Sequence, residues 1–245
     1  HPDAMWNKRV NEKEMRKDLK KSLEELKTDY IDIYILHRDD PDTDVAVAVE
    51  TFNAMHEEGS IRAFGASNWM HTRIEEANEY AYKHNLIPFS VSSPNFCLAR
   101  QVEDPWGGGC VNISGPENQE ARAWYEKNQM PVIAYASLGR GFFSGRMKSE
   151  YADHASDYLD SFAMTGYACS DNFERLRRCE IIAEKHGVTV AQIAMNWIFS
   201  HPLNIFAIAS MSKADRMKAN REALLLQLSD EEIAYLNLET PEFCG

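Results

Sequence analysis

The segment Asp29-Tyr30-Ile31-Asp32-Ile33-Tyr34-Ile35-Leu36-His37-Arg38-Asp39-Asp40-Pro41 decides the fold class of this chain. Residues 30–36 are almost all aromatic or β-branched, which is typical of a strand that is covered on both faces. The run ends in His37, three charged residues and Pro41. Such a strand brings polar groups to its carboxyl end, where α/β barrels place their active sites. A core strand followed by a solvated turn is the structural alternative.

Composition limits the classes of protein that fit this chain. It has 245 residues, of which 44% are hydrophobic, enough for one large domain with a substantial core. The formal net charge of −12 argues against nucleic acid or an anionic membrane as a partner, and no apolar run is long enough to span a bilayer. The five cysteines form no CxxC pair, and the first residues do not form a signal peptide. We therefore expect a cytoplasmic protein with reduced thiols and no metal site.

Hydrophobic periodicity predicts helices and strands in alternation, the order typical of a parallel sheet. Asp44, Thr189 and Ser229 are predicted N-caps, the last within a capping box. Residues 94–116 and 147–170 are expected to be long irregular excursions. Strands are expected over residues 30–36, 61–65, 89–92, 132–135 and 205–208, and helices over residues 11–27, 45–58, 70–84, 117–128, 171–186, 189–200, 214–224 and 229–238.

Several motifs occur together in the order and spacing of one known family. They are Asp29–Asp32 running to His37, Phe64–Trp69, Ala134–Leu138, Ala191–Ala194, and Ser210 through Arg216 to Asn220. With these motifs the chain resembles an aldo-keto reductase over nearly its whole length. The resemblance implies a TIM barrel that binds NADPH and passes hydride to a small-molecule carbonyl substrate. It therefore implies an oxidoreductase that reduces an aldehyde or ketone to an alcohol.

The number of expected strands departs from the family pattern. A TIM barrel has eight strands in about 250 residues, and the expected strands correspond to the fourth to the eighth. We therefore expect residues 1–245 to form one N-terminally truncated aldo-keto reductase domain, an incomplete barrel that lacks its first three βα units. Because barrel closure pairs the first and last strands, residues 30–36 and 205–208 would form open edges that favour self-association.

The catalytic set of the family has one match in this sequence. The resemblance assigns His37 to orienting the carbonyl, whereas the Asp, Tyr and Lys of the family have no match. Without a proton donor, this chain alone is predicted to be inactive. A nucleotide-binding regulatory subunit or an inactive truncated paralogue is the alternative. A kinase is dismissed because no Asp-Phe-Gly follows His37-Arg38-Asp39. A metal-dependent hydrolase that uses His37 and Asp39 is a poor alternative, because no other strand end carries suitable ligands.

The resemblance also implies residues that contact the nicotinamide end of the cofactor. Ser67 and Asn68 match the contacts to the carboxamide, where an amide is recognised through paired donors and acceptors. Ser93 stands where the family usually has Gln. Tyr135 matches the aromatic residue that stacks on the nicotinamide ring.

A second group of residues matches the contacts to the phosphates and adenine. Arg216 is expected to favour NADPH over NADH through a charge-assisted contact with the 2′-phosphate. Without the resemblance, the serines would be assigned as helix caps and Arg216 to a solvated helix face. The pyrophosphate contacts are Leu138, Arg140, Gly141 and Arg146, and those to the 2′-phosphate and adenine are Ser210, Ser212, Arg216 and Asn220.

Overall fold

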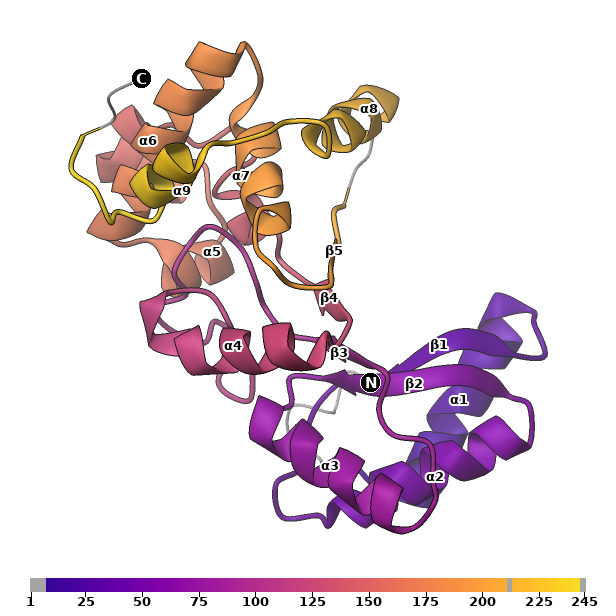
Figure 1. The fold of residues 1–245 in the computed structure, drawn as a ribbon. Coiled ribbons are helices and arrows are strands. Elements are labelled where there is room, and N and C mark those ends of the chain that lie inside the picture. Colours follow the sequence, from indigo (N-terminus) through magenta and orange to yellow (C-terminus); the bar gives the residue numbers. More distant parts are fainter. Residues whose placement is uncertain (1–7, 211–212, 243–245) are drawn as a thin grey trace. The chain divides into compact units, whose positions relative to one another are not determined.

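The computed structural model describes residues 8–210 and 213–242 (Figure 1). The chain divides into two compact units, His1–Ser93 and Pro94–Gly245, and each is described on its own. Within the described ranges, no helix is both long and apolar enough to cross a membrane.

The first unit is a layer of parallel strands covered by helices on one side (Figure 1). Strand β2 pairs with β1 and β3, with Ile31 opposite Ile61. Phe52 of α2 stacks on Phe64 of β2 with ring centroids 5.1 Å apart, so the core lies between helices and sheet. The described elements are α1 (Glu12–Leu26), β1 (Ile31–Leu36), α2 (Val45–Glu57), β2 (Ile61–Ser67), α3 (His71–Lys83) and β3 (Val91–Ser93).

Strands β2 and β3 approach each other closely at Gly65. A Cβ atom at this position would lie 1.9 Å from the carbonyl oxygen of Val91, so no larger residue fits without moving the backbone. The same pairing places Ser67 opposite Ser93 at the carboxyl ends of the two strands. Glycine at position 65 therefore permits the close pairing in which two predicted site residues lie opposite each other.

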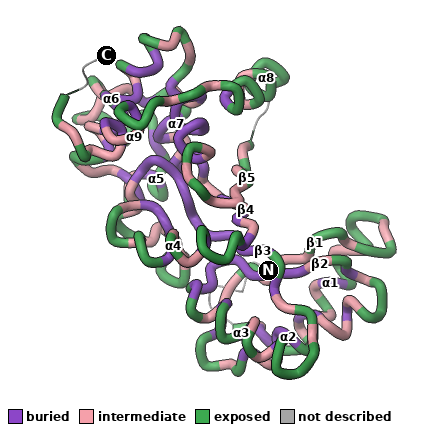
Figure 2. Tube along the Cα trace, in the orientation of Figure 1, coloured by how far each residue is buried: buried purple, intermediate pink, exposed green. Residues whose placement is uncertain are grey.

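Strand β1 pairs with one neighbour among the described residues, which is β2. Its residues are half-buried or exposed, and Ile33 is 50% exposed, whereas most of β2 is buried (Figure 2). The structure thus leaves apolar side chains of β1 accessible. Self-association through such an edge is not tested by these observations and stays a prediction.

The second unit combines a short parallel pair of strands with a group of helices (Figure 1). Strand β4 pairs with β5, with Val132 opposite Ile205 and Ala134 opposite Ala207. The described strands and α-helices are α4 (Gln119–Asn128), β4 (Val132–Ala134), α5 (Ser161–Tyr167), α6 (Ser170–His186), α7 (Val190–Phe199), β5 (Ile205–Ala207), α8 (Ala214–Ala223) and α9 (Asp230–Leu236).

The three predicted N-caps are confirmed, but one predicted loop is wrong. Asp44 accepts a hydrogen bond from the backbone of α2, and Thr189 and Ser229 each form a capping box. Residues 147–170 were expected to be irregular, yet they contain a 3-10 helix over Ser149–Asp157 and the helix α5. The carboxylate of Asp160 accepts the Ala163 N–H at 2.7 Å and starts α5, a cap that the periodicity of so short a helix does not reveal.

Candidate functional site

His37 follows directly on the last residue of β1. It lines a cavity of about 380 Å³ together with Arg38 and Asp39. Partial burial of the imidazole lowers its pKa below the usual value of 6.5, and the charge of Arg38 acts in the same direction. The ring is therefore uncharged at neutral pH, the form in which one nitrogen donates a hydrogen bond and the other accepts one.

The end of β2 brings the predicted nicotinamide contacts beside the backbone of His37. The hydroxyl of Ser67 donates to the carbonyl oxygen of Ser93 at 2.7 Å. The side-chain amide of Asn68 donates to the carbonyl oxygen of His37 at 3.1 Å, and it also lies 3.1 Å from the Ser67 hydroxyl. Ser67, Asn68 and Ser93 are all buried. Four predicted site residues thus meet at the carboxyl ends of the strands in the first unit.

A cavity of about 580 Å³ in the second unit collects most of the predicted phosphate contacts. Its walls come from the loop after β4, the end of β5, and the first turns of α7 and α8. Helix α8 begins at Ala214, so its unpaired N–H groups and the positive end of its dipole lie next to Arg216. The predicted residues that line this cavity are Leu138, Arg140, Gly141, Ser210, Arg216 and Asn220.

Local backbone geometry shapes the loop that lines this cavity. The Ser137 hydroxyl lies 3.1 Å from the carbonyl oxygen of Ala134 and 2.9 Å from that of Ile208, so it joins the ends of β4 and β5. Gly141 has a φ of +96°, a conformation that other residues rarely adopt. No atom lies closer than 3.8 Å to a Cβ built there, so the backbone angle, rather than a close contact within the protein, requires this glycine.

The guanidinium of Arg140 already binds other side chains in this structure. Its guanidinium pairs with Asp160 at 2.7 Å and lies over the rings of Trp106 and Phe162, 5.4 and 5.0 Å from their centroids. The hydrogen bond from Arg140 lowers the pKa of the Asp160 carboxyl. A pyrophosphate bound in the cavity would therefore compete with Asp160 for this guanidinium.

Two predicted contacts within the described ranges, Tyr135 and Arg146, are not part of the cavity lining. Tyr135 packs edge-on against Trp106 with centroids 6.2 Å apart, and Arg146 is exposed. Ser212 lies outside the described residues. In turn, sequence reasoning did not assign Thr189 and Asp215, which do line the cavity. Their only sequence signals were the predicted cap at Thr189 and the position of Asp215 beside Arg216.

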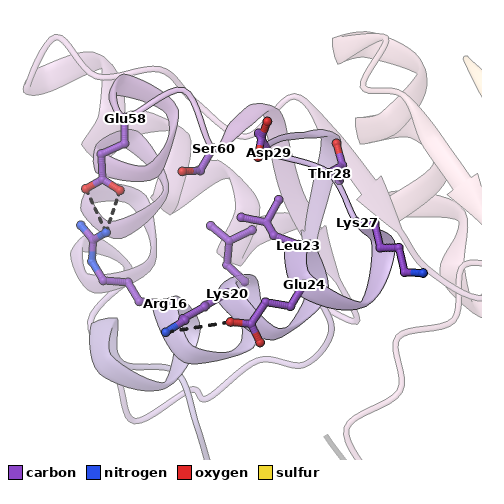
Figure 3. Close-up of a pocket in the computed structure, with 10 residues that line it drawn as sticks. Arg16, Lys20, Leu23, Glu24, Lys27, Thr28, Asp29, Glu58 and Ser60 are labelled. Atoms are coloured by element: carbon purple, nitrogen blue, oxygen red, sulfur yellow. Dashed lines mark hydrogen bonds and ion pairs between the residues drawn. The ribbon is translucent and has the colours of Figure 1, made fainter.

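Another cavity, of about 530 Å³, lies at the opposite end of β1 (Figure 3). Arg16 binds Glu58 at 2.9 Å there, and Lys20 lies 3.9 Å from Glu24. Because these charges are paired and the cavity adjoins the starts of the strands, we assign it no chemistry. In the described part of the chain, no group of three or more His, Cys, Asp or Glu side chains is arranged to hold a metal ion.

The sequence matches the model of the aldo/keto reductase family over residues 1–238. The chain belongs to this family. It is 25% identical over 217 residues to the aldo-keto reductase str7 of Strobilurus tenacellus, a match that covers 87% of this chain and 59% of that protein. It is 24% identical to the aldo-keto reductase YhdN of Bacillus subtilis, with 93% and 63% covered. The chain thus spans about three fifths of the length of these curated relatives.

A solved structure shows the fold. The thermostable aldo-keto reductase Tm1743, solved with the inhibitor epalrestat, aligns with 94% of this chain and 67% of its own chain at a TM-score of 0.67 and 23% identity. The predicted truncated barrel is wrong, because the family model matches residues 1–238 and 94% of this chain aligns with the solved fold. The five described strands belong to this (β/α) barrel fold.

Proposed function

We propose that this aldo/keto reductase binds NADPH and reduces an aldehyde or ketone to an alcohol. The observation that carries the proposal is the cavity of about 580 Å³ in the second unit, which gathers the residues that match the phosphate contacts of the family. A cavity of this volume falls within the range of ordinary small-molecule sites.

The donors around this cavity suit the phosphate end of the cofactor. Arg216 and Ser210 lie beside the start of α8, where backbone N–H groups favour anions. A guanidinium also forms a stronger contact with a doubly charged 2′-phosphate than with the 2′-hydroxyl of NADH. We therefore assign Arg216 to discrimination between the two cofactors.

The first unit supplies the groups for the nicotinamide and the carbonyl. Ser67 and Asn68 would hold the carboxamide, and the bound cofactor would supply the hydride. The neutral imidazole of His37 would donate a hydrogen bond to the carbonyl oxygen and stabilise the negative charge that develops there.

Binding and turnover are measured separately to test this proposal. The purified chain is titrated with NADPH by fluorescence, and NADPH oxidation is followed at 340 nm with a simple aldehyde in the native chain and in His37→Ala. We expect saturable binding, together with turnover that His37→Ala reduces. Absence of NADPH binding would refute the proposal. Binding without turnover would instead favour the regulatory subunit that the sequence left open.

Two further expectations from the sequence concern the activity of this chain and its location. The comparisons do not support the prediction that this chain is inactive, so the turnover measurement decides that point. The cytoplasmic location stays a prediction.

A further inference from the structure

The loop that carries His37 is bound by one arginine of the neighbouring helix. Arg73, in the first turn of α3, pairs through Nε with the carboxylate of Asp39 at 3.3 Å. Its Nη2 donates to the carbonyl oxygen of Asp40 at 3.3 Å and also to that of Thr43. A single guanidinium thus contacts three residues of the loop 37–44. A further ion pair, with the exposed Glu76, lies on its own helix.

Asp39 and the ring of Trp69 together hold the side chain of Arg73 in place. Its side chain is 15% exposed and that of Asp39 is 14% exposed. The guanidinium also lies over the ring of Trp69, 5.1 Å from the centroid. Burial raises the pKa of Asp39, and the charge of Arg73 opposes that change. A buried carboxylate without its cation is unfavourable, so loss of Arg73 would push Asp39 to rearrange.

The contacts of Arg73 restrain the backbone on the C-terminal side of His37. Asn68 already holds the carbonyl oxygen of His37 at 3.1 Å. Asp39 lies two residues further along and lines the same cavity of about 380 Å³ as His37. The imidazole therefore projects from a segment that is fixed at its own carbonyl by Asn68 and beyond it by Arg73.

We propose that Arg73 is a positioning residue for His37, acting through the loop 37–44 without contacting substrate or cofactor. This inference rests on the proposed function in one respect, namely that His37 orients the carbonyl. Small displacements of a catalytic group lower the rate steeply, by about 100-fold for roughly 1 Å. The role requires the fork of the guanidinium as well as its charge, because backbone carbonyls and a carboxylate are bound together.

Kinetics of Arg73→Met and Arg73→Lys test the proposal, with Arg62→Met as the matched control. Arg62 also pairs with an aspartate, Asp32 at 3.3 Å, and lies over the ring of Tyr30, but it is 62% exposed and both of these partners lie outside the loop 37–44. We expect Arg73→Met to lower kcat by about 10- to 100-fold with the KM for NADPH within about twofold. Arg73→Lys should recover part of the loss, and Arg62→Met should change neither constant.

An NMR readout separates failure of this proposal from failure of the proposed function. The ring signals of His37, assigned with His37→Gln, should shift in Arg73→Met and stay unchanged in Arg62→Met, whether or not the chain turns over substrate. Unchanged ring signals would overturn the proposal, and so would an unchanged kcat in an active chain.

A double variant covers the case in which Arg73→Met does not fold. The double variant Arg73→Met/Asp39→Asn removes the uncompensated carboxylate, and circular dichroism checks that it is folded. A folded double variant with displaced His37 signals supports positioning. A folded double variant with native His37 signals shows that Arg73 only neutralises Asp39 and would overturn the proposal.

Discussion

Arg216→Ala tests the assignment of the cofactor site. Arg216 lines the cavity of about 580 Å³ from the first turn of α8 and is exposed, so solvent weakens its contact with a phosphate. Charge-assisted contacts contribute about 1–3 kcal/mol, and exposure places this one in the lower half of that range. NADPH binding should therefore weaken by about 5- to 30-fold, since each 1.4 kcal/mol corresponds to about tenfold. NADH lacks the 2′-phosphate and should lose about twofold or less.

Fluorescence titration of both cofactors, at low and at high salt, gives four dissociation constants for the native chain and four for each variant. The matched control is Arg221→Ala, because Arg221 lies on the same helix but does not line the cavity. The effect of Arg216→Ala on NADPH should shrink at high salt, as expected for an exposed contact. Equal losses for NADPH and NADH, or an equal effect of Arg221→Ala, would refute the assignment of the 2′-phosphate to this helix.

Three further substitutions test the structure at other points. Gly65→Ala places a Cβ 1.9 Å from a carbonyl oxygen of β3, so we expect a loss of more than about 4 kcal/mol in urea unfolding; a native-like midpoint would contradict the close approach of β2 and β3. Asp160→Asn keeps a good N-cap but weakens the hold on Arg140, and NADPH should bind about 2- to 10-fold more tightly; weaker binding would show that Asp160 does not compete with the pyrophosphate. The pKa of Glu174 is lowered from 4.5 to about 2, chiefly by the hydrogen bond from Arg177, so its stabilising contribution is complete above its unfolded pKa and is lost as pH falls through the folded value. The difference in unfolding free energy between the native chain and Glu174→Gln should therefore shrink as pH falls below about 4.5, and a difference independent of pH would contradict this origin.

Features that are set by a few consecutive residues were predictable from the sequence. The strand before His37 was visible because its run of aromatic and β-branched residues is a local pattern, and Tyr34 of that strand packs edge-on against Phe52. The expected cover on both faces is wrong, because the residues of β1 are half-buried or exposed. The caps at Asp44 and Thr189 were visible because an N-cap is a local feature of two or three residues. Such signals do not depend on the rest of the fold, which is why sequence reasoning identifies them.

Other features depend on contacts that a sequence does not display. The position of Arg140 over the rings of Trp106 and Phe162, and its pairing with Asp160, joins segments that are far apart in the chain. The contacts of Arg73 with the loop after β1 likewise bring together residues about thirty positions apart. The truncated barrel was inferred by counting expected strands, and that count could not show how far the domain of the family extends.

The backbone at the strand ends supports placing the chemistry there. Asn68, directly after β2, has a φ of +60°, and Ala136, two residues after β4, has a φ of +53°. A residue other than glycine in this left-handed region is strained by about 1–3 kcal/mol, and such strain persists where the surrounding structure enforces it. Asparagine tolerates this conformation better than most residues, whereas alanine has no polar side chain with which to compensate. Both residues follow the carboxyl ends of parallel strands, where barrel enzymes carry their active sites. Asn68 holds the backbone of His37 and Ala136 lines the cavity assigned to the cofactor, so in each unit one residue with this conformation adjoins the groups to which we assign function.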